Sequence, residues 1–257
     1  MAFIPNGSGG PVSGVGVSSA DVMDNGLRAY MLRIYNWMAL GLLISAAVAY
    51  LIAETPLRDY FYATAMQVDG QIVTSPTLLG WGVVFLPLIF VFVLSAGVNR
   101  FSRETVQTLF IIYSASMGAC LSSILLRYEG GSIARAFAIS AATFLAMSLW
   151  GYTTRRSLAS MGSFLFMGLI GLILASIAQI FIHSSGLNFG INVAGVLIFT
   201  LLTAYDTQRI RATYAYYTQY SGTADLGKYS VYDALSLYLN FVNLFVFLLQ
   251  FIGVRRQ

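Results

Sequence analysis

The sequence predicts an all-α integral membrane protein with about seven transmembrane helices, and three observations lead to this fold class. Hydrophobic residues make up 58% of the chain and charged residues only 9%, against about 25% charged residues in a typical soluble domain. The apolar residues gather in seven long runs, most of them near the roughly 20 residues that cross a bilayer as a helix. The 257 residues suffice for seven such helices with short connections and one tail. These observations argue against a soluble enzyme, and we expect no catalytic activity.

Residues 1–26 precede the first apolar run and differ from it in composition. They are rich in Gly, Ser, Val and Pro and contain neither Lys nor Arg. They therefore lack the basic start and the apolar centre of a cleavable signal peptide. We expect a disordered N-terminal tail over 1–26, followed by a membrane domain of seven helices over 27–257.

The seven apolar runs follow one another along this membrane domain. They are Tyr35–Ala53, Leu78–Val98, Thr105–Leu126, Ala136–Tyr152, Met161–Ile182, Ile191–Tyr205 and Val231–Val254. Backbone groups inside lipid have to bond to one another, so these runs should be helical. The alternating ten-residue strands of a membrane barrel do not occur in them. The fourth and sixth runs are short, and we expect flanking residues to complete their crossings.

Lys and Arg residues near the ends of the runs predict the orientation in the membrane. Successive connections alternate between the two sides, which divides the 14 basic residues into nine and five. The nine are Arg28, Arg33, Arg100, Arg103, Arg155, Arg156, Arg209, Arg211 and Lys228, and the five are Arg58, Arg127, Arg135, Arg255 and Arg256. The side with more basic residues is normally cytoplasmic, so we expect the N-terminus in the cytoplasm. Basic residues that lie singly or in pairs beside apolar runs also argue against nucleic-acid binding.

Small residues recur at intervals of four in two of the predicted helices. Ser114, Gly118 and Ser122 do so in the third run, and Gly171 and Ala175 do so in the fifth. Such spacing lets the backbones of two membrane helices approach closely. We therefore expect both faces to pack against neighbouring helices.

Two acidic residues lie at the ends of apolar runs rather than in the connections. Asp206 closes the sixth run and Asp233 opens the seventh. An Asp at the centre of a membrane helix costs roughly 2.5–3.5 kcal/mol, so such residues are candidates for function. For Asp233 we favour an interfacial role, because an acid in the first turn of a helix is favourable there. For Asp206 we favour a functional role, and Arg209, three residues later, can pair with it along the helix.

The seventh run carries an unusual stripe of polar side chains on one face. The stripe consists of Asp233, Ser236, Asn240, Asn243 and Gln250. The first four members are spaced by three, four and three residues, which places them on one side of a helix. Such a stripe should face other helices or a water-filled cavity. A carboxylate held there loses hydration, which favours its neutral form unless a cation or a donor compensates. Since Ca²⁺ prefers several oxygen ligands, Asp206 is also a possible calcium ligand.

Three segments of the sequence together resemble the Bax inhibitor-1 family, the transmembrane Bax-inhibitor-motif proteins, in their bacterial form. They are TFLAMSLWGYTT at 143–154, FTLLTAYDTQ at 199–208 and ALSLYLNFVNLF at 234–245. The resemblance extends from about Leu27 to Val254. It implies a seven-helix bundle with the last helix near its centre, and a pH-sensitive calcium leak across the cell's inner membrane.

The resemblance also implies a proton-sensing site, which this sequence matches in part. In calcium-leaking relatives two aspartates on the last two helices share a proton, and an arginine near the end of the second helix acts as a latch for the closed state. The first aspartate corresponds to Asp206 and the latch to Arg100, but the second aspartate position holds Asn240, which cannot titrate. Asp233 lies two turns before Asn240 on nearly the same face, about 10 Å along the helix, which is long for direct hydrogen bonding to the same proton. It remains a candidate substitute, so the candidate proton-sensing and ion-pathway residues are Asp206, Asn240 and Asp233. We expect a calcium or cation leak gated by protonation around Asp206.

Other functions are weighed against this hypothesis. Some bacterial relatives act on a membrane-anchored ATP-dependent protease, so a regulator of such a protease is the main alternative, with Met1–Gly26 as the segment that would capture it. An intramembrane aspartyl protease would need a second acid in a Gly-x-Gly-Asp segment, which the sequence lacks. A zinc enzyme finds no support, because His183 is the sole histidine and no ligand cluster accompanies it. We expect no cofactor, other than Ca²⁺ as the transported ion.

Overall fold

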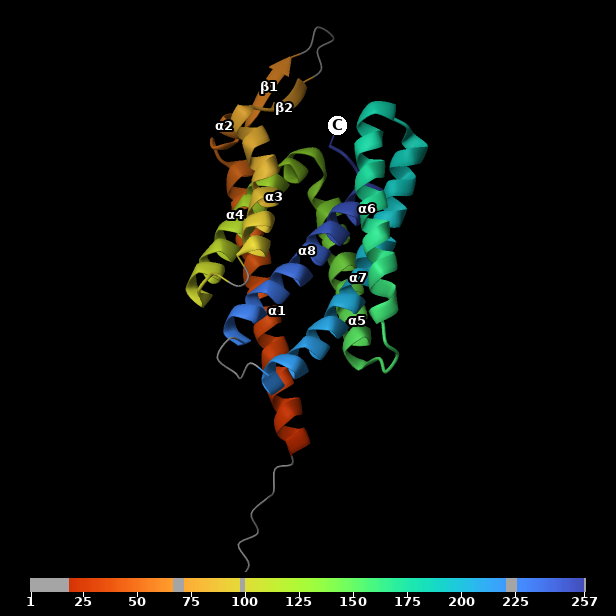
Figure 1. Ribbon diagram of the computed structural model, residues 1–257. Coiled ribbons are helices and arrows are strands. Elements are labelled where there is room, and N and C mark those ends of the chain that lie inside the picture. Colours follow the sequence, from red (N-terminus) through yellow and green to blue (C-terminus); the bar gives the residue numbers. More distant parts are fainter. Residues whose placement is uncertain (1–18, 67–71, 98–99, 221–225, 257) are drawn as a thin grey trace, which may run out of the picture.

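The computed structural model describes residues 19–66, 72–97, 100–220 and 226–256, and it is mainly helical (Figure 1). Its elements are α1 (Ser19–Glu54), α2 (Arg58–Phe61), β1 (Tyr62–Met66), β2 (Ile72–Pro76), α3 (Leu78–Ala96), α4 (Arg103–Arg127), α5 (Gly130–Thr153), α6 (Ala159–Ile182), α7 (Ser185–Tyr220) and α8 (Leu226–Ile252). The two strands pair as an antiparallel hairpin between α2 and α3. The predicted helical architecture is thus confirmed, apart from this short hairpin.

Six helices in the described part of the chain are long and apolar enough to cross a membrane: α1, α4, α5, α6, α7 and α8. The second predicted crossing, over Leu78–Val98, corresponds to α3, whose described apolar part Leu78–Leu94 is shorter than the other six. A crossing needs about 20 apolar residues when the helix stands upright. Length and composition therefore support six of the seven predicted crossings, and α3 does not meet the same criterion.

Several helices extend beyond the apolar runs from which they were predicted. The fourth predicted run begins at Ala136, whereas α5 begins at Gly130. The sixth predicted run ends at Tyr205, whereas α7 continues to Tyr220 and is 36 residues long. Hydrophobicity identifies only the part of a helix that lies in lipid. The helix itself continues into the polar residues that lie outside the lipid. The two runs that looked short are completed in this way.

The first helix begins inside the range predicted to be a tail. Residues 1–18 lie outside the described residues, but α1 starts at Ser19 and so includes the last eight residues of the range 1–26. The segment proposed to capture a protease, Met1–Gly26, therefore lies mostly outside the described residues.

The helices form one bundle in which α8 contacts several others. In Figure 1 the β1–β2 hairpin, the α4–α5 connection and the C-terminus lie at the upper end, and the start of α1 and the α5–α6 connection lie at the lower end. α8 packs against α1, α4, α5 and α7. In its most apolar window 56% of the residues are buried, more than in any other of the six spans. α6, by contrast, packs mainly against α7 and exposes most of its apolar side chains.

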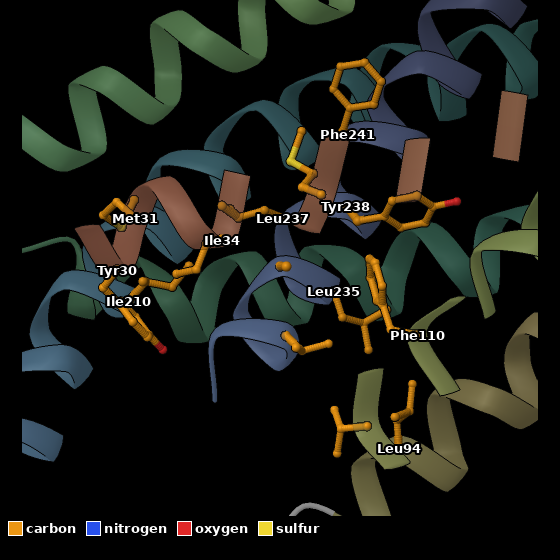
Figure 2. Packing of buried hydrophobic residues seen from close by; sticks show 14 of the residues in the cluster. Tyr30, Met31, Ile34, Leu94, Phe110, Ile210, Leu235, Leu237, Tyr238 and Phe241 are labelled. Carbon is orange, nitrogen blue, oxygen red and sulfur yellow. The ribbon is translucent and has the colours of Figure 1, made fainter. Parts of the chain in front are cut away.

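The centre of the bundle is a cluster of aromatic and aliphatic side chains from α1, α3, α4, α5, α7 and α8 (Figure 2). The ring of Tyr238 on α8 meets Phe110 and Tyr113 of α4 edge-on, with centroids 6.0 and 5.7 Å apart. Ile34 of α1 is fully buried in the same cluster. In a bilayer such contacts stabilise the bundle by close packing, since lipid tails are as apolar as the core.

Glycines bring two pairs of helices into backbone contact. A Cβ atom at Gly118 of α4 would clash with the backbone of Ser45 on α1, which confirms the predicted packing face of the third run. The prediction for the fifth run is wrong at Gly171, which is exposed on α6 and has no neighbouring atom within 4 Å of a Cβ position. Gly151 of α5, which the spacing rule did not identify, lies directly against the carbonyl of Ala204 on α7. This contact fixes the position of α7 against α5 at Ala204, two residues before Asp206.

Candidate functional site

The side chain of Asp206 is buried between α7 and α8, with both carboxylate oxygens occupied. Asn240 of α8 donates a hydrogen bond from Nδ2 to Oδ2 of Asp206 over 2.7 Å. The guanidinium of Arg209 lies 3.1 Å from Oδ1, at the i+3 position of the same helix. Asp206 is 7% exposed and Asn240 is 5% exposed. The structure thus brings together Asp206 and Asn240, the two positions that the sequence comparison paired, and forms the predicted Arg209 contact.

This arrangement compensates the charge of a carboxylate that is removed from water. A buried ionised carboxylate is costly unless it is paired and hydrogen-bonded. Charge-assisted bonds from a guanidinium and an amide supply that compensation. Arg209 is 45% exposed at its side chain, so the site connects a buried acid to a cation that touches solvent or headgroups.

A chain of hydroxyl groups continues from this site across α5 to α1. Thr207, the residue after Asp206, lies with its Oγ1 3.0 Å from Oγ of Ser148 on α5. Ser148 in turn contacts the Tyr35 hydroxyl of α1 at 2.5 Å. The sequence had singled out neither Ser148 nor Tyr35 as a site residue. Ser148 lies within the resembling segment at 143–154, whereas no sequence signal identified Tyr35.

Gln208 joins α7 to the α5–α6 connection. Its Oε1 accepts a hydrogen bond from the backbone N–H of Leu158 at 2.6 Å, and its Nε2 donates to the carbonyl of Arg156 at 2.8 Å. Two of the three resembling segments, 143–154 and 199–208, lie side by side near Asp206 through the contacts of Ser148 with Thr207 and of Gly151 with Ala204. After Ser148 and Tyr35, Gln208 is a third site neighbour that the sequence did not single out.

Asp233 lies apart from Asp206 and has a different partner. It is half-buried on α8 and accepts a hydrogen bond of 2.6 Å from the hydroxyl of Tyr30 on α1. Arg209 donates to Ser236, one turn along α8 from Asp233, at 3.3 Å. Arg209 therefore contacts Asp206 directly and also reaches the α8 face that carries Asp233. No hydrogen bond joins the two described carboxylates, in keeping with the distance expected along the helix.

The latch predicted at Arg100 does not contact Asp206. Arg100 follows the end of α3 and is exposed, and the ion pair recorded within the described residues joins Arg209 to Asp206. Arg209 stands one turn from Asp206 on the same helix, so its guanidinium reaches the carboxylate without any movement of another helix. Within the described residues Arg209 is thus the ion-pair partner of Asp206 in this conformation, and a latch role for Arg100 stays a prediction.

The second half of the polar stripe lines a cavity between α4 and α8. The cavity has a volume of about 820 Å³, and both Asn243 and Gln250 contribute to its wall. Asn243 is three residues beyond Asn240, which is about 4.5 Å along the helix. The stripe therefore faces neighbouring helices at one end and a cavity at the other, as the sequence predicted.

A resident metal ion fits this site poorly in the conformation described. Within the described residues no group of three or more His, Cys, Asp or Glu side chains could hold a metal. A cation at Asp206, the predicted calcium ligand, would have to displace Arg209, because two positive charges at one carboxylate repel each other. His183 is exposed at the end of α6, far along the sequence from any acid.

Known proteins are similar to this chain over nearly all of its length. The profile of the family described as "Inhibitor of apoptosis-promoting Bax1" matches residues 27–257. A protein of Caulobacter vibrioides is 44% identical over 236 residues, which are 91% of this chain and 92% of the relative. The inner membrane protein YbhL of Escherichia coli K12 is 41% identical over 231 residues, which are 90% and 94% of the two chains. RP147 of Rickettsia prowazekii is 40% identical over 242 residues, which are 93% and 95%.

Proposed function

This chain belongs to the Bax inhibitor-1 family, and from that membership we propose that it is a pH-sensitive calcium, or more generally cation, leak of the inner membrane. Protonation around Asp206 gates the leak. The observation that carries the proposal is the buried carboxylate of Asp206, held between Asn240 of one helix and Arg209 of its own. Such an ionisable group inside a membrane protein is a functional site by default.

The contacts of Asp206 support a particular closed state. While the carboxylate is charged, Arg209 bonds to it and also to Ser236 of α8, which ties α7 to α8. Protonation removes the charge that attracts the guanidinium, and the tie weakens. The leak is therefore expected to increase as the pH falls. In this mechanism Arg209 takes the part that the resemblance assigned to Arg100.

A route for the ion is supported by the polar stripe of α8. Asn243 lies one turn from Asn240 on this stripe, and Asn240 bonds to Asp206. Oxygen atoms of amide and carboxylate groups are suitable transient ligands for Ca²⁺. The ion is the cargo in this proposal, and it meets Asp206 after Arg209 has moved aside.

We also propose that α3 crosses the membrane with the other six spans, giving seven crossings with α8 at their centre and the N-terminus in the cytoplasm. Two features support this arrangement. α3 packs against α4, and the hairpin before it lies at the same end of the bundle as the α4–α5 connection (Figure 1). The distribution of basic residues favours the same orientation.

Calcium flux into proteoliposomes, measured between pH 5 and pH 8, tests the proposed function. The variant Asp206→Asn keeps the shape of the side chain but cannot be charged, so we expect flux that no longer depends on pH. Asp59→Asn removes an exposed acid of α2 and serves as the matched control, with an unchanged pH response. Flux through Asp206→Asn that still follows the wild-type pH curve would defeat the proposal.

A further inference from the structure

The cavity between α4 and α8 has a strongly cationic mouth at the end of the bundle where the chain terminates. Three arginines contribute to its wall, Arg127 at the end of α4 and the neighbouring pair Arg255 and Arg256. All three are exposed. Arginine at such a position presents a planar fork of donors that fits carboxylate and phosphate oxygens.

Backbone hydrogen bonds hold the three arginines close together. Residues after α8 run antiparallel to the residues after α4, with Tyr128 and Arg255 as bridge partners. The N–H of Arg256 donates to the carbonyl of Arg127 over 2.9 Å, and the N–H of Glu129 donates to that of Val254 over 3.1 Å. Arg127 and Arg256 are thus cross-strand neighbours.

This pairing places positive charges side by side, and Glu129 is the neighbouring acid in the sequence. Like charges on directly opposed residues are unfavourable. Within residues 19–66, 72–97, 100–220 and 226–256, no carboxylate lies within ion-pair distance of Arg127, Arg255 or Arg256. An anionic ligand at the mouth would offset this repulsion and accept hydrogen bonds from several guanidinium groups.

The wall behind the mouth has a different character. Aliphatic side chains of α4 and α8, among them Leu121, Ile124, Val242 and Val246, form its apolar part. Asn188 of α7 and Asn243 of α8 add amide groups at intervals. A cavity with a cationic mouth and an apolar wall matches a molecule that has an anionic head and a hydrocarbon tail.

We propose that this cavity binds an anionic phospholipid, with the headgroup phosphate held by Arg127, Arg255 and Arg256 and one acyl chain along the aliphatic wall. Basic pockets between membrane helices are known to suit anionic headgroups, and Arg127 ends a membrane span, the level at which headgroups lie. Free phosphate shares the chemistry of the head. The aliphatic wall favours the lipid, because it would give inorganic phosphate nothing to contact.

Native mass spectrometry of the full-length protein measures retention of the lipid. Phosphatidylglycerol and zwitterionic phosphatidylethanolamine are titrated separately into the purified protein. The variant R255Q/R256Q should bind phosphatidylglycerol about tenfold more weakly, since two charged donors are lost. R155Q/R156Q removes an equal charge from an exposed pair in the α5–α6 connection and should bind as the wild type does. Equal weakening in both variants, or equal retention of both lipids, would overturn the proposal.

The chain's own cysteine provides a second readout that needs no arginine variant. Cys120, the single cysteine of the sequence, lines the same cavity. Phosphatidylglycerol should slow alkylation of Cys120 by a maleimide several-fold, whereas phosphatidylethanolamine and inorganic phosphate at millimolar concentration should not. Protection by inorganic phosphate equal to that by the lipid would overturn the assignment to a lipid, and a rate unaffected by any of the three would overturn the site.

Discussion

Asp206 has an unusual set of neighbours for an acid in a membrane helix, a neutral amide on one oxygen and a partly exposed guanidinium on the other. Asn240 can donate to the carboxylate but cannot exchange a proton with it. A site with two carboxylates at this distance would retain one proton, because both cannot be ionised together. The chemistry of residue 240 therefore decides whether the site holds one titrating group or a coupled pair.

Asn240→Asp should convert the site to such a pair. The new carboxylate would stand where the amide now lies, 2.7 Å from Asp206, and the two acids would share a proton. We expect the midpoint of the flux–pH curve to move upward by about one unit or more, together with a steeper response. Calcium flux in proteoliposomes across a pH series measures both. A curve that overlays the wild type would mean that the two side chains do not meet in the working protein.

Arg209→Gln tests the tie between α7 and α8. Without the guanidinium, Asp206 loses its ion pair and Ser236 loses a donor. Flux at neutral pH should rise by up to about fivefold, the change that about 1 kcal/mol produces in an equilibrium. Arg211→Gln is the control, since Arg211 bonds to the carbonyl of Tyr152 instead. If calcium flux through Arg209→Gln at neutral pH equals that of the wild type, Arg209 is not the latch.

At the scale of the helices, the close approach of α5 to α7 depends on a glycine, Gly151, which has no side chain. The backbone at Gly151 touches the carbonyl of Ala204, two residues before Asp206 on α7. A larger side chain has to push the helices apart, because backbone atoms cannot rearrange as side chains do. The distance between Ser148 and Thr207, which joins the same two helices, would then increase as well.

Gly151→Val should destabilise the bundle by about 1–3 kcal/mol, the usual cost of overpacking. Gly171→Val is a matched control, because it makes the same change in a membrane helix at an exposed position with nothing within 4 Å. Thermal unfolding of both variants in the same detergent, followed by tryptophan fluorescence, gives the comparison. Equal melting temperatures would mean that the α5–α7 contact is looser than described.

Across the whole molecule, the crossing of α3 determines which connections share a side of the membrane. With seven crossings α2 and the α4–α5 connection lie on the same side, and with six they lie on opposite sides. Single cysteines at Asp59 and Glu129, both exposed, introduced into a Cys120→Ser background, distinguish the two. We expect both to react with a membrane-impermeant maleimide from the periplasmic side of intact cells. Labelling of one site alone would rule out seven crossings.

The sequence predicted the parts of this architecture that depend on local pattern. Apolar runs located the membrane helices, and the spacing along α8 identified the face that bears Asn240 and Asn243. Helix ends were less predictable, since α7 continues past the polar residues Asp206 and Arg209 where hydrophobicity gives no signal. Partners distant in sequence, such as Tyr30 for Asp233 across 203 positions, depend on how the helices pack. The place of Arg100 relative to Asp206 is likewise a property of the folded bundle, and its role as a latch stays a prediction.

The short backbone pairing beyond α8 limits how that helix can move. Its carboxyl end is fastened to the α4–α5 turn through Val254 and Arg256, and Val254 also donates to the Ser132 hydroxyl of α5 over 3.1 Å. Sliding of α8 along its own axis would break all of these bonds at once. A tilt about the fastened end would keep them while swinging the end that carries Tyr229 and Asp233 through the larger arc. If opening requires α8 to move, the helix should rotate about its C-terminal end, and its N-terminal end should move farthest.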